Sequence, residues 1–249
     1  MSLFNDKLKE ITLKEVLILI IALFFIQYFI NSFNIVHIDV VWIYILLIFY
    51  FIFKLITELF SITDDISSLF SRDIIKSVLV IVCLNIFFSY GMLYFCDFIL
   101  KGVNSCNAFN TFLPFSFLAT IVVSPISEEL IFRGVFLNRL KLIVPTTFAV
   151  LISSLLFASL HGFGSIFSAF IFAVCVAILY LKTDNILVPI FAHFLNNLIA
   201  EVIVFLDSGE ILFTNNLVMG AVSILAVISF VLILYFIVKQ LNSINHNNF

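Results

Sequence analysis

The chain has 249 residues, of which 63% are hydrophobic and 11% are charged, and its mean hydropathy is +1.27. Soluble domains usually carry about 25% charged residues, so this composition excludes a soluble globular protein and indicates an integral membrane protein. The formal net charge of -3 is spread along the chain without a basic patch, which argues against a nucleic-acid partner and leaves the lipid bilayer as the expected surroundings.

Long apolar runs follow one another along the whole chain. A spanning helix needs about 20 apolar residues, and the first run lacks a cleavage site, so we interpret it as a retained span and not as a signal peptide. In chain order, the predicted spans are residues 15–33, 38–57, 74–96, 112–138, 143–161, 165–181, 186–204 and 212–238. The sequence therefore predicts an all-α, polytopic transmembrane helix bundle of about eight spans.

The basic residues test this series independently. With the N-terminus inside, ten of the 12 Lys and Arg residues fall in inner segments, whereas the outer loops hold only Lys101. Arg133 is set aside because it lies within a span. Since cytoplasmic segments carry the excess of Lys and Arg, both termini are expected to face the cytoplasm. The frequent Ile, Phe and Asn residues are typical of an AT-rich bacterial genome, so we expect a bacterial cell membrane.

The fourth predicted span contains "SPISEELIFRG", in which two carboxylates and an arginine interrupt the apolar sequence. Residues four apart share a helix face, so Glu129 can pair with Arg133 and each can neutralise the other in the membrane. Glu128 then points about 100° away around the helix axis and is free to face a cavity. The alternative is a structural ion pair with a spare glutamate at a helix kink near Pro125.

Two later spans carry further polar residues at helical spacing. "FASLHGFG" places Phe157 and His161 four apart, and "FAHFLNN" places His193 and Asn197 four apart. A single histidine in such a place is more often a packing residue than a catalyst. Counted at about 1.5 Å per residue from the inner ends of the spans, however, Glu128 and these three polar side chains reach one layer inside the bilayer, which favours a shared site.

These motifs resemble those of a known family. EExxxR in "EELIFR", FxxxH in "FASLH" and HxxxN in "HFLNN", in that order, look like the three motifs of the CPBP family, the type II CAAX prenyl endopeptidases and their bacterial relatives, also called the Abi family. The resemblance covers about residues 112–204, which would form the catalytic core in spans 4 to 7. It leaves residues 1–111, with spans 1 to 3, and residues 205–249, with the last span and a cytoplasmic tail, without a recognised motif.

The resemblance implies an intramembrane endopeptidase that uses neither a metal nor a cofactor. Glu128 and His161 would activate a water molecule, while His193 and Asn197 would stabilise the oxyanion. The expected substrate is a peptide or protein associated with the membrane, such as a pheromone or bacteriocin precursor. Three further residues would organise the site, namely Glu129, Arg133 and Phe157.

Three alternatives stay open at this stage. A zinc protease could use the same histidines and glutamates as ligands, although HExxH is absent and asparagine is a poor zinc ligand. Family members near bacteriocin genes are associated with self-immunity, which could act by binding without cleavage. A transporter or channel would be favoured by discontinuous helices in corresponding halves of the chain, and the sequence shows no such symmetry.

Overall fold

The structure is a computed structural model that describes residues 2–33, 37–99, 117–161, 166–207 and 211–246. Lys101, the outer-loop residue in the charge argument, lies outside these ranges. Every regular element in the described part of the chain is a helix, and none of them is a strand. The predicted all-α fold is therefore confirmed.

The first half of the chain forms a short helix and three long ones. A short turn of 3-10 helix, Ile56–Ser61, joins the second long helix to a further short one. The helices are α1 (Leu3–Glu10), α2 (Leu13–Ser32), α3 (Val40–Leu55), α4 (Ile62–Leu69) and α5 (Arg72–Ile99).

The second half begins with the helix that carries the two adjacent glutamates. Its path is π-helical at Ala119–Val123, α-helical in α7 (Ser124–Glu129), π-helical again at Leu130–Leu137 and α-helical in α8 (Asn138–Leu140). The remaining helices are α9 (Thr146–Ser159), α10 (Ile166–Thr183), α11 (Leu187–Leu206), α12 (Ile211–Thr214) and α13 (Asn216–His246).

The number of membrane crossings is close to the predicted one. By length and apolar composition, 6 helices of the described chain could cross a membrane. The other two predicted spans correspond to α9, an apolar helix of 14 residues, and to the interrupted helix from Ala119 to Leu140. Each of the predicted runs thus overlaps a helix of an integral membrane protein, while the count of about eight crossings stays a prediction.

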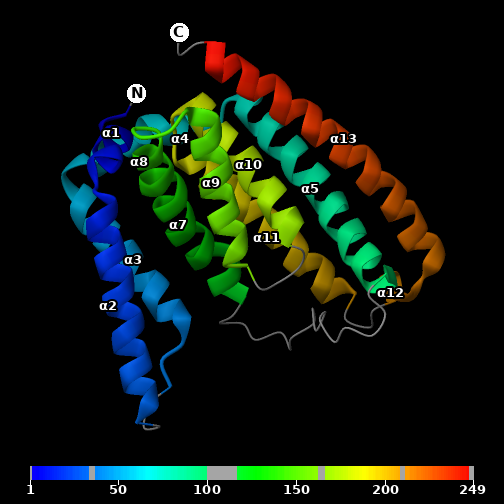
Figure 1. The fold of residues 1–249 in the computed structure, drawn as a ribbon, viewed down its shortest axis with the longest axis horizontal. Coiled ribbons are helices and arrows are strands. Elements are labelled where there is room, and N and C mark those ends of the chain that lie inside the picture. The colour runs from blue at the N-terminus through cyan, green and yellow to red at the C-terminus, as the bar shows by residue number, and fades with distance from the viewer. Residues whose placement is uncertain (1, 34–36, 100–116, 162–165, 208–210, 247–249) are drawn as a thin grey trace.

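The helices form one bundle with both ends of the chain at the same end of it (Figure 1). α5 and α13 pack along one flank, and α2 with α3 form a hairpin on the other. α10 lies between them and is the most buried of the long helices, with small or branched side chains from Ala173 to Leu179 in full contact with its neighbours. The helix from Ala119 to Leu140, called the motif helix below, contacts α10, and so do α9 and α11. The three motifs therefore meet in the middle of the bundle.

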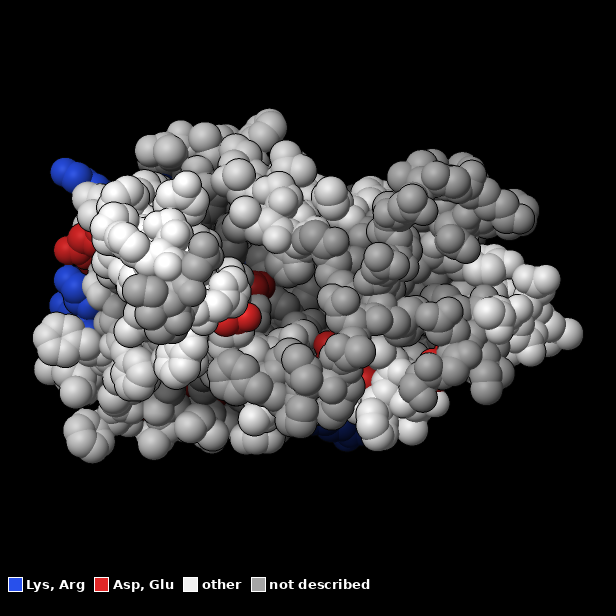
Figure 2. Space-filling model, turned by 90° about the horizontal axis from the view of Figure 1, so that it is seen from below, with Lys and Arg blue, Asp and Glu red and all other residues white. Residues whose placement is uncertain are grey.

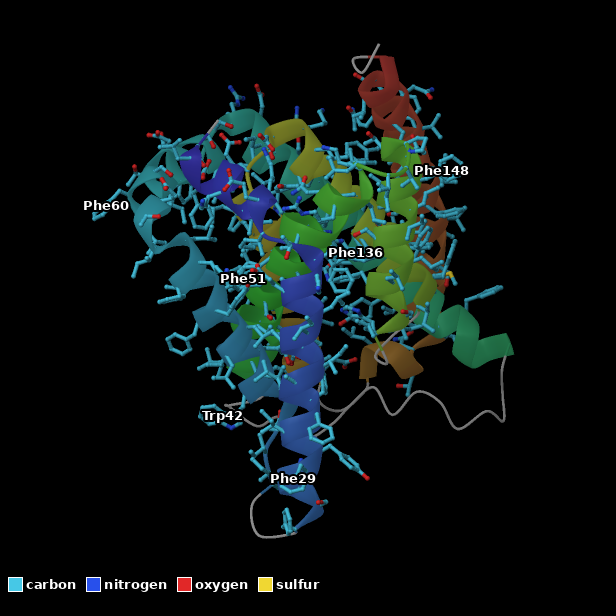
Figure 3. All side chains as sticks on the ribbon, turned by 60° about the vertical axis from the view of Figure 1, so that its left-hand side comes forward. Phe29, Trp42, Phe51, Phe60, Phe136 and Phe148 are labelled. Carbon is cyan, nitrogen blue, oxygen red and sulfur yellow. The ribbon has the colours of Figure 1, made fainter. Side chains whose placement is uncertain are left out.

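Aromatic residues show which surfaces face outward. Phe51 on α3 is buried, whereas Trp42 on the same helix and Phe60 in the turn after it project away from the bundle (Figure 3). Phe148 on α9 and Phe29 on α2 are also largely exposed. Large apolar side chains over so much of an outer surface are typical of a bundle embedded in a bilayer.

α1 closes the bundle at the end where the termini lie. Its apolar side buries Leu8 against Gly134 of the motif helix, so closely that a Cβ atom at Gly134 would lie 2.9 Å from a Leu8 methyl group. The Asn5 side chain donates to Asp65 at 2.8 Å and accepts from the backbone N–H of Ile186 at 3.0 Å. Arg139 donates to the backbone carbonyl of Ile11 at 3.0 Å. These bonds tie α1 to three separate parts of the chain.

The α5–α13 contact depends on a glycine, which gives a test of the packing. A Cβ atom at Gly91 would lie 2.3 Å from the Ala226 Cβ, whereas one at Gly220 would meet nothing within 4 Å. We expect Gly91→Ala to destabilise the fold by about 1 to 3 kcal/mol through overpacking. Gly220→Ala should instead be neutral or stabilising by up to about 1 kcal/mol, the usual helix preference for alanine.

Thermal unfolding of both variants in detergent micelles measures this difference. Equal behaviour of the two variants would show that α5 and α13 do not pack as closely as described.

Candidate active site

The motif helix presents its glutamates from a region of irregular helical winding. Pro125 lies inside the helical path that begins at Ala119, so its missing N–H removes one backbone hydrogen bond to the preceding turn. π-helical segments lie directly before and after α7, and such segments are frequent at functional sites because they redirect side chains. Both glutamates, which lie between these two segments, are buried.

Glu129 is the centre of a fully buried charge cluster. Its Oε1 accepts from Arg133 Nη1 at 2.9 Å, as the spacing of four residues predicts, and also from His193 Nδ1 at 2.9 Å. Arg133 donates in addition to the carbonyl of Ala173 at 3.0 Å and lies over the Phe157 ring at 4.5 Å. The side chains of Glu129 and Arg133 are 0% and 1% exposed, so each charge depends on the other for its stability.

Glu128 lies on the neighbouring face and approaches the histidine of the second motif. Its Oε2 is 3.5 Å from His161 Nε2, and its Oε1 accepts from the Ser124 hydroxyl one turn earlier. Oε2 is buried and has no hydrogen-bond partner among the residues that the structure describes. Glu128 therefore offers one unoccupied carboxylate oxygen toward His161.

The hydrogen bonds fix which nitrogen of each histidine is free. His161 Nδ1 lies 2.8 Å from the Phe157 carbonyl oxygen, which can only accept, so Nδ1 carries the hydrogen. His193 Nδ1 likewise donates to the Glu129 carboxylate. In the neutral form, both histidines then present the lone pair of Nε2 to the site. His193 can donate from Nε2 only as the imidazolium, with hydrogens on both nitrogens.

The third motif contributes the side-chain amide of Asn197, which a series of hydrogen bonds between asparagines holds in place. Asn197 donates to the Thr120 carbonyl at 2.9 Å and accepts from Asn196 at 3.4 Å, while Asn196 accepts from Asn85 on α5 at 2.8 Å. Asn85 is buried, and its role as an interhelical hydrogen bonder is the one expected from the sequence. One N–H of Asn197 remains for another acceptor.

Tyr44 is a site residue that sequence reasoning missed. It lies on α3, which packs against α7, and its hydroxyl lies near Glu128 and Ser124. A tyrosine in the run "WIYILLIFYF" reads as one of several aromatic residues of a lipid-embedded helix. No spacing rule links it to Glu128, because the two residues are distant in sequence.

The same residues could hold a metal ion. Glu128, His161 and His193 can each bring one ligand atom within 4.8 Å of the others. One carboxylate and two imidazoles are a frequent ligand set for a catalytic zinc ion. Metal-binding histidines also commonly donate their second nitrogen to a carboxylate or a carbonyl, as His193 and His161 do here. The donor set therefore fits zinc in type and in supporting contacts.

The structure brings all the motif residues named from the sequence into one region. Glu128 meets His161, Glu129 meets Arg133 and His193, and Phe157 stacks 4.2 Å from His161 between their rings. Asn197, on α11, donates a hydrogen bond to the Thr120 carbonyl near the start of the motif helix. The roles of these residues in a reaction remain predictions.

Comparison with known proteins bears on the family. Residues 110–199 match the family model described as type II CAAX prenyl endopeptidase Rce1-like. No curated protein and no solved structure was found to match the chain. The matched residues include all three motifs. The match confirms the resemblance that these motifs indicate: over residues 110–199 the chain carries a domain of the type II CAAX prenyl endopeptidase, or CPBP, family.

Proposed function

We propose that the protein is an intramembrane endopeptidase that cleaves a membrane-associated peptide or protein with a water molecule activated by Glu128 and His161. The observation that carries this proposal is that two unoccupied hydrogen-bond acceptors lie side by side. Glu128 Oε2 and His161 Nε2 lie 3.5 Å apart, and neither is occupied by another side chain of the described residues. A water molecule can donate one hydrogen to each of them.

This arrangement suits general base catalysis. A water that donates both hydrogens keeps a lone pair for the scissile carbonyl carbon, and one of the two acceptors removes its proton as the new C–O bond forms. The same group can then return the proton to the leaving amine when the C–N bond breaks. Ser124 holds the other oxygen of Glu128, so the carboxylate keeps its orientation during these steps.

His193 and Asn197 are proposed to bind the oxyanion. His193 would donate from Nε2 as an imidazolium, which the Glu129 carboxylate 2.9 Å from Nδ1 would stabilise. Asn197 has one N–H left after its bond to Thr120. Two such fixed donors in a site of low dielectric constant stabilise a developing negative charge strongly. Glu129, Arg133 and Phe157 would then position His193 without touching the substrate.

The proposal includes the setting of the enzyme. Residues 112–204 would form the catalytic core, with the earlier and later spans as its support. The termini would face the cytoplasm of a bacterial cell, because the Lys and Arg residues gather in the segments on their side. The substrate would be a peptide or protein at the membrane.

A zinc-dependent protease is the second candidate function. It is favoured by the grouping of Glu128, His161 and His193 within 4.8 Å and by the acceptors on both Nδ1 atoms. A bound zinc ion would supply a water that ionises near neutral pH. Asn197 would then supply a hydrogen bond to the oxyanion.

A chelation experiment separates the two candidates. The probe is a fluorescence-quenched peptide that ends in a farnesylated cysteine and three aliphatic residues, added to the purified protein in detergent micelles. We expect cleavage to survive exhaustive treatment with EDTA or phenanthroline. In the proposed mechanism, side chains alone activate the water and bind the oxyanion, so no metal is needed. Loss of cleavage after chelation, with recovery on adding one equivalent of zinc, would establish the second candidate instead.

A further inference from the structure

The bundle is closed at the end where the termini lie. α1 lies across the motif helix there, with Leu8 fully buried on Gly134. Next to it, Leu137, Tyr180 and Ile186 are each no more than 1% exposed. These buried side chains lie between the charge cluster of Glu129 and the terminal end, so the described residues are closely packed on that side.

At the opposite end of the bundle, the described helices end at different heights. α9 has 14 residues and α10 has 18, so these two neighbours rise about 21 Å and 27 Å, whereas α5 with 28 residues rises about 42 Å. His161 follows directly after α9 and therefore lies where the shorter helices end. Figure 2 looks onto this end and shows it hollowed near the middle, with Asp or Glu side chains visible inside.

The solvent exposure of the site residues increases from the closed end of the bundle toward the opposite end. The side chains of Glu129, Arg133 and His193, on the closed side, are 0%, 1% and 3% exposed. Those of Glu128 and His161 are 11% and 28% exposed. The pair that would hold the reactive water is thus the part of the site nearest the opening.

The positions of the Lys and Arg residues indicate which side of the membrane each end of the bundle faces. Ten of the 12 Lys and Arg residues belong to the segments at the closed end, from Lys7 in α1 to Lys239 near the end of α13. Arg133 is the remaining described cation, and it is buried in its ion pair. Because the excess of Lys and Arg faces the cytoplasm, the closed end is the cytoplasmic one.

From these observations we infer that the active site opens to the extracytoplasmic side and that its substrates present their cleavage site there. This inference rests on the proposed function. The substrate class is then an exported or membrane-anchored peptide whose scissile segment lies in the outer half of the bilayer or outside it. Cytoplasmic C-termini, including prenylated ones held at the inner leaflet, would not reach Glu128 and His161 in an intact cell.

Thiol labelling in sealed vesicles tests this inference without an activity assay. The four native cysteines are replaced by alanine, and single cysteines are introduced as His161→Cys in the site and as the control Lys182→Cys at the closed end. The probe is a sulfonated maleimide that does not cross membranes. In right-side-out vesicles we expect it to label His161→Cys and to leave Lys182→Cys unlabelled. In inside-out vesicles the pattern should reverse.

Labelling of His161→Cys only in inside-out vesicles would overturn the inference, and so would its failure to label in either kind of vesicle. Labelling of Lys182→Cys in right-side-out vesicles would show that the orientation is wrong. Because labelling needs no cleavage, it stays informative if the protein proves not to be a protease. The labelling result therefore stands or falls separately from the cleavage result in micelles.

Discussion

Glu128→Gln is expected to fold like the wild type and to lose cleavage of the quenched peptide by about 10²- to 10⁴-fold, the usual contribution of a general base. The substitution keeps the size of the side chain and leaves the Ser124 hydroxyl a partner, so the thermal unfolding temperature should hardly change. It removes the acceptor that faces His161 at 3.5 Å. His161→Ala should lower the rate to a similar extent, because the water would lose its other acceptor.

Glu201→Gln is the matched control for this experiment. Glu201 lies on α11, one turn beyond Asn197, and is partly buried in the same bundle, yet no contact links it to Glu128 in the described structure. We expect this variant to cleave at the wild-type rate. A Glu128→Gln protein that also cleaves at that rate would remove Glu128 from the mechanism.

Glu129→Gln is expected to act on stability first. The variant would leave Arg133 as an unpaired charge in a site where it is 1% exposed, and breaking a buried pair in this way costs about 3 to 5 kcal/mol. The amount of folded protein and its unfolding temperature in micelles should both fall. His193 would lose a charged partner as well, so any protein that folds should also be less active.

Glu15→Gln is the control for this second substitution. Glu15 forms an ion pair with Lys54 at 3.4 Å, and both side chains are well exposed. Exposed pairs of this kind contribute about 0 to 1 kcal/mol, so this variant should unfold at nearly the wild-type temperature. If Glu128→Gln and Glu129→Gln accumulated equally and had equal activity, the division of roles between the two glutamates would be wrong.

The parts of the site that the sequence predicts are those that follow from helical spacing. The pair of Glu129 and Arg133 comes from two residues four apart, and so does the carbonyl of Phe157 on His161. The all-α fold follows from hydropathy in the same direct way, because a bilayer leaves helices as the means of satisfying the backbone in apolar runs of this length.

Contacts between distant helices were not predictable in this way. Tyr44 and Asn85 belong to helices without a recognised motif, and only the packing of α3 on α7 and of α5 on α11 brings them to Glu128 and Asn196. The π-helical segments around α7 also have no clear signal in the sequence. The bond from His193 to Glu129 joins two motifs, and its geometry depends on how the helices rotate against each other.

The place of α1 has a consequence for how the protein is made. α1 is the first helix to be synthesised, but the groups that hold it come much later in the chain: Arg139 for the carbonyl of Ile11, and the N–H of Ile186 for Asn5. Contacts of such long sequence separation form slowly and late in folding. The closure of the bundle at the terminal end would therefore be completed only after α11 has begun to insert. Until that moment, the ion pair of Glu129 and Arg133 would lack both its cover by α1 and its contact with His193.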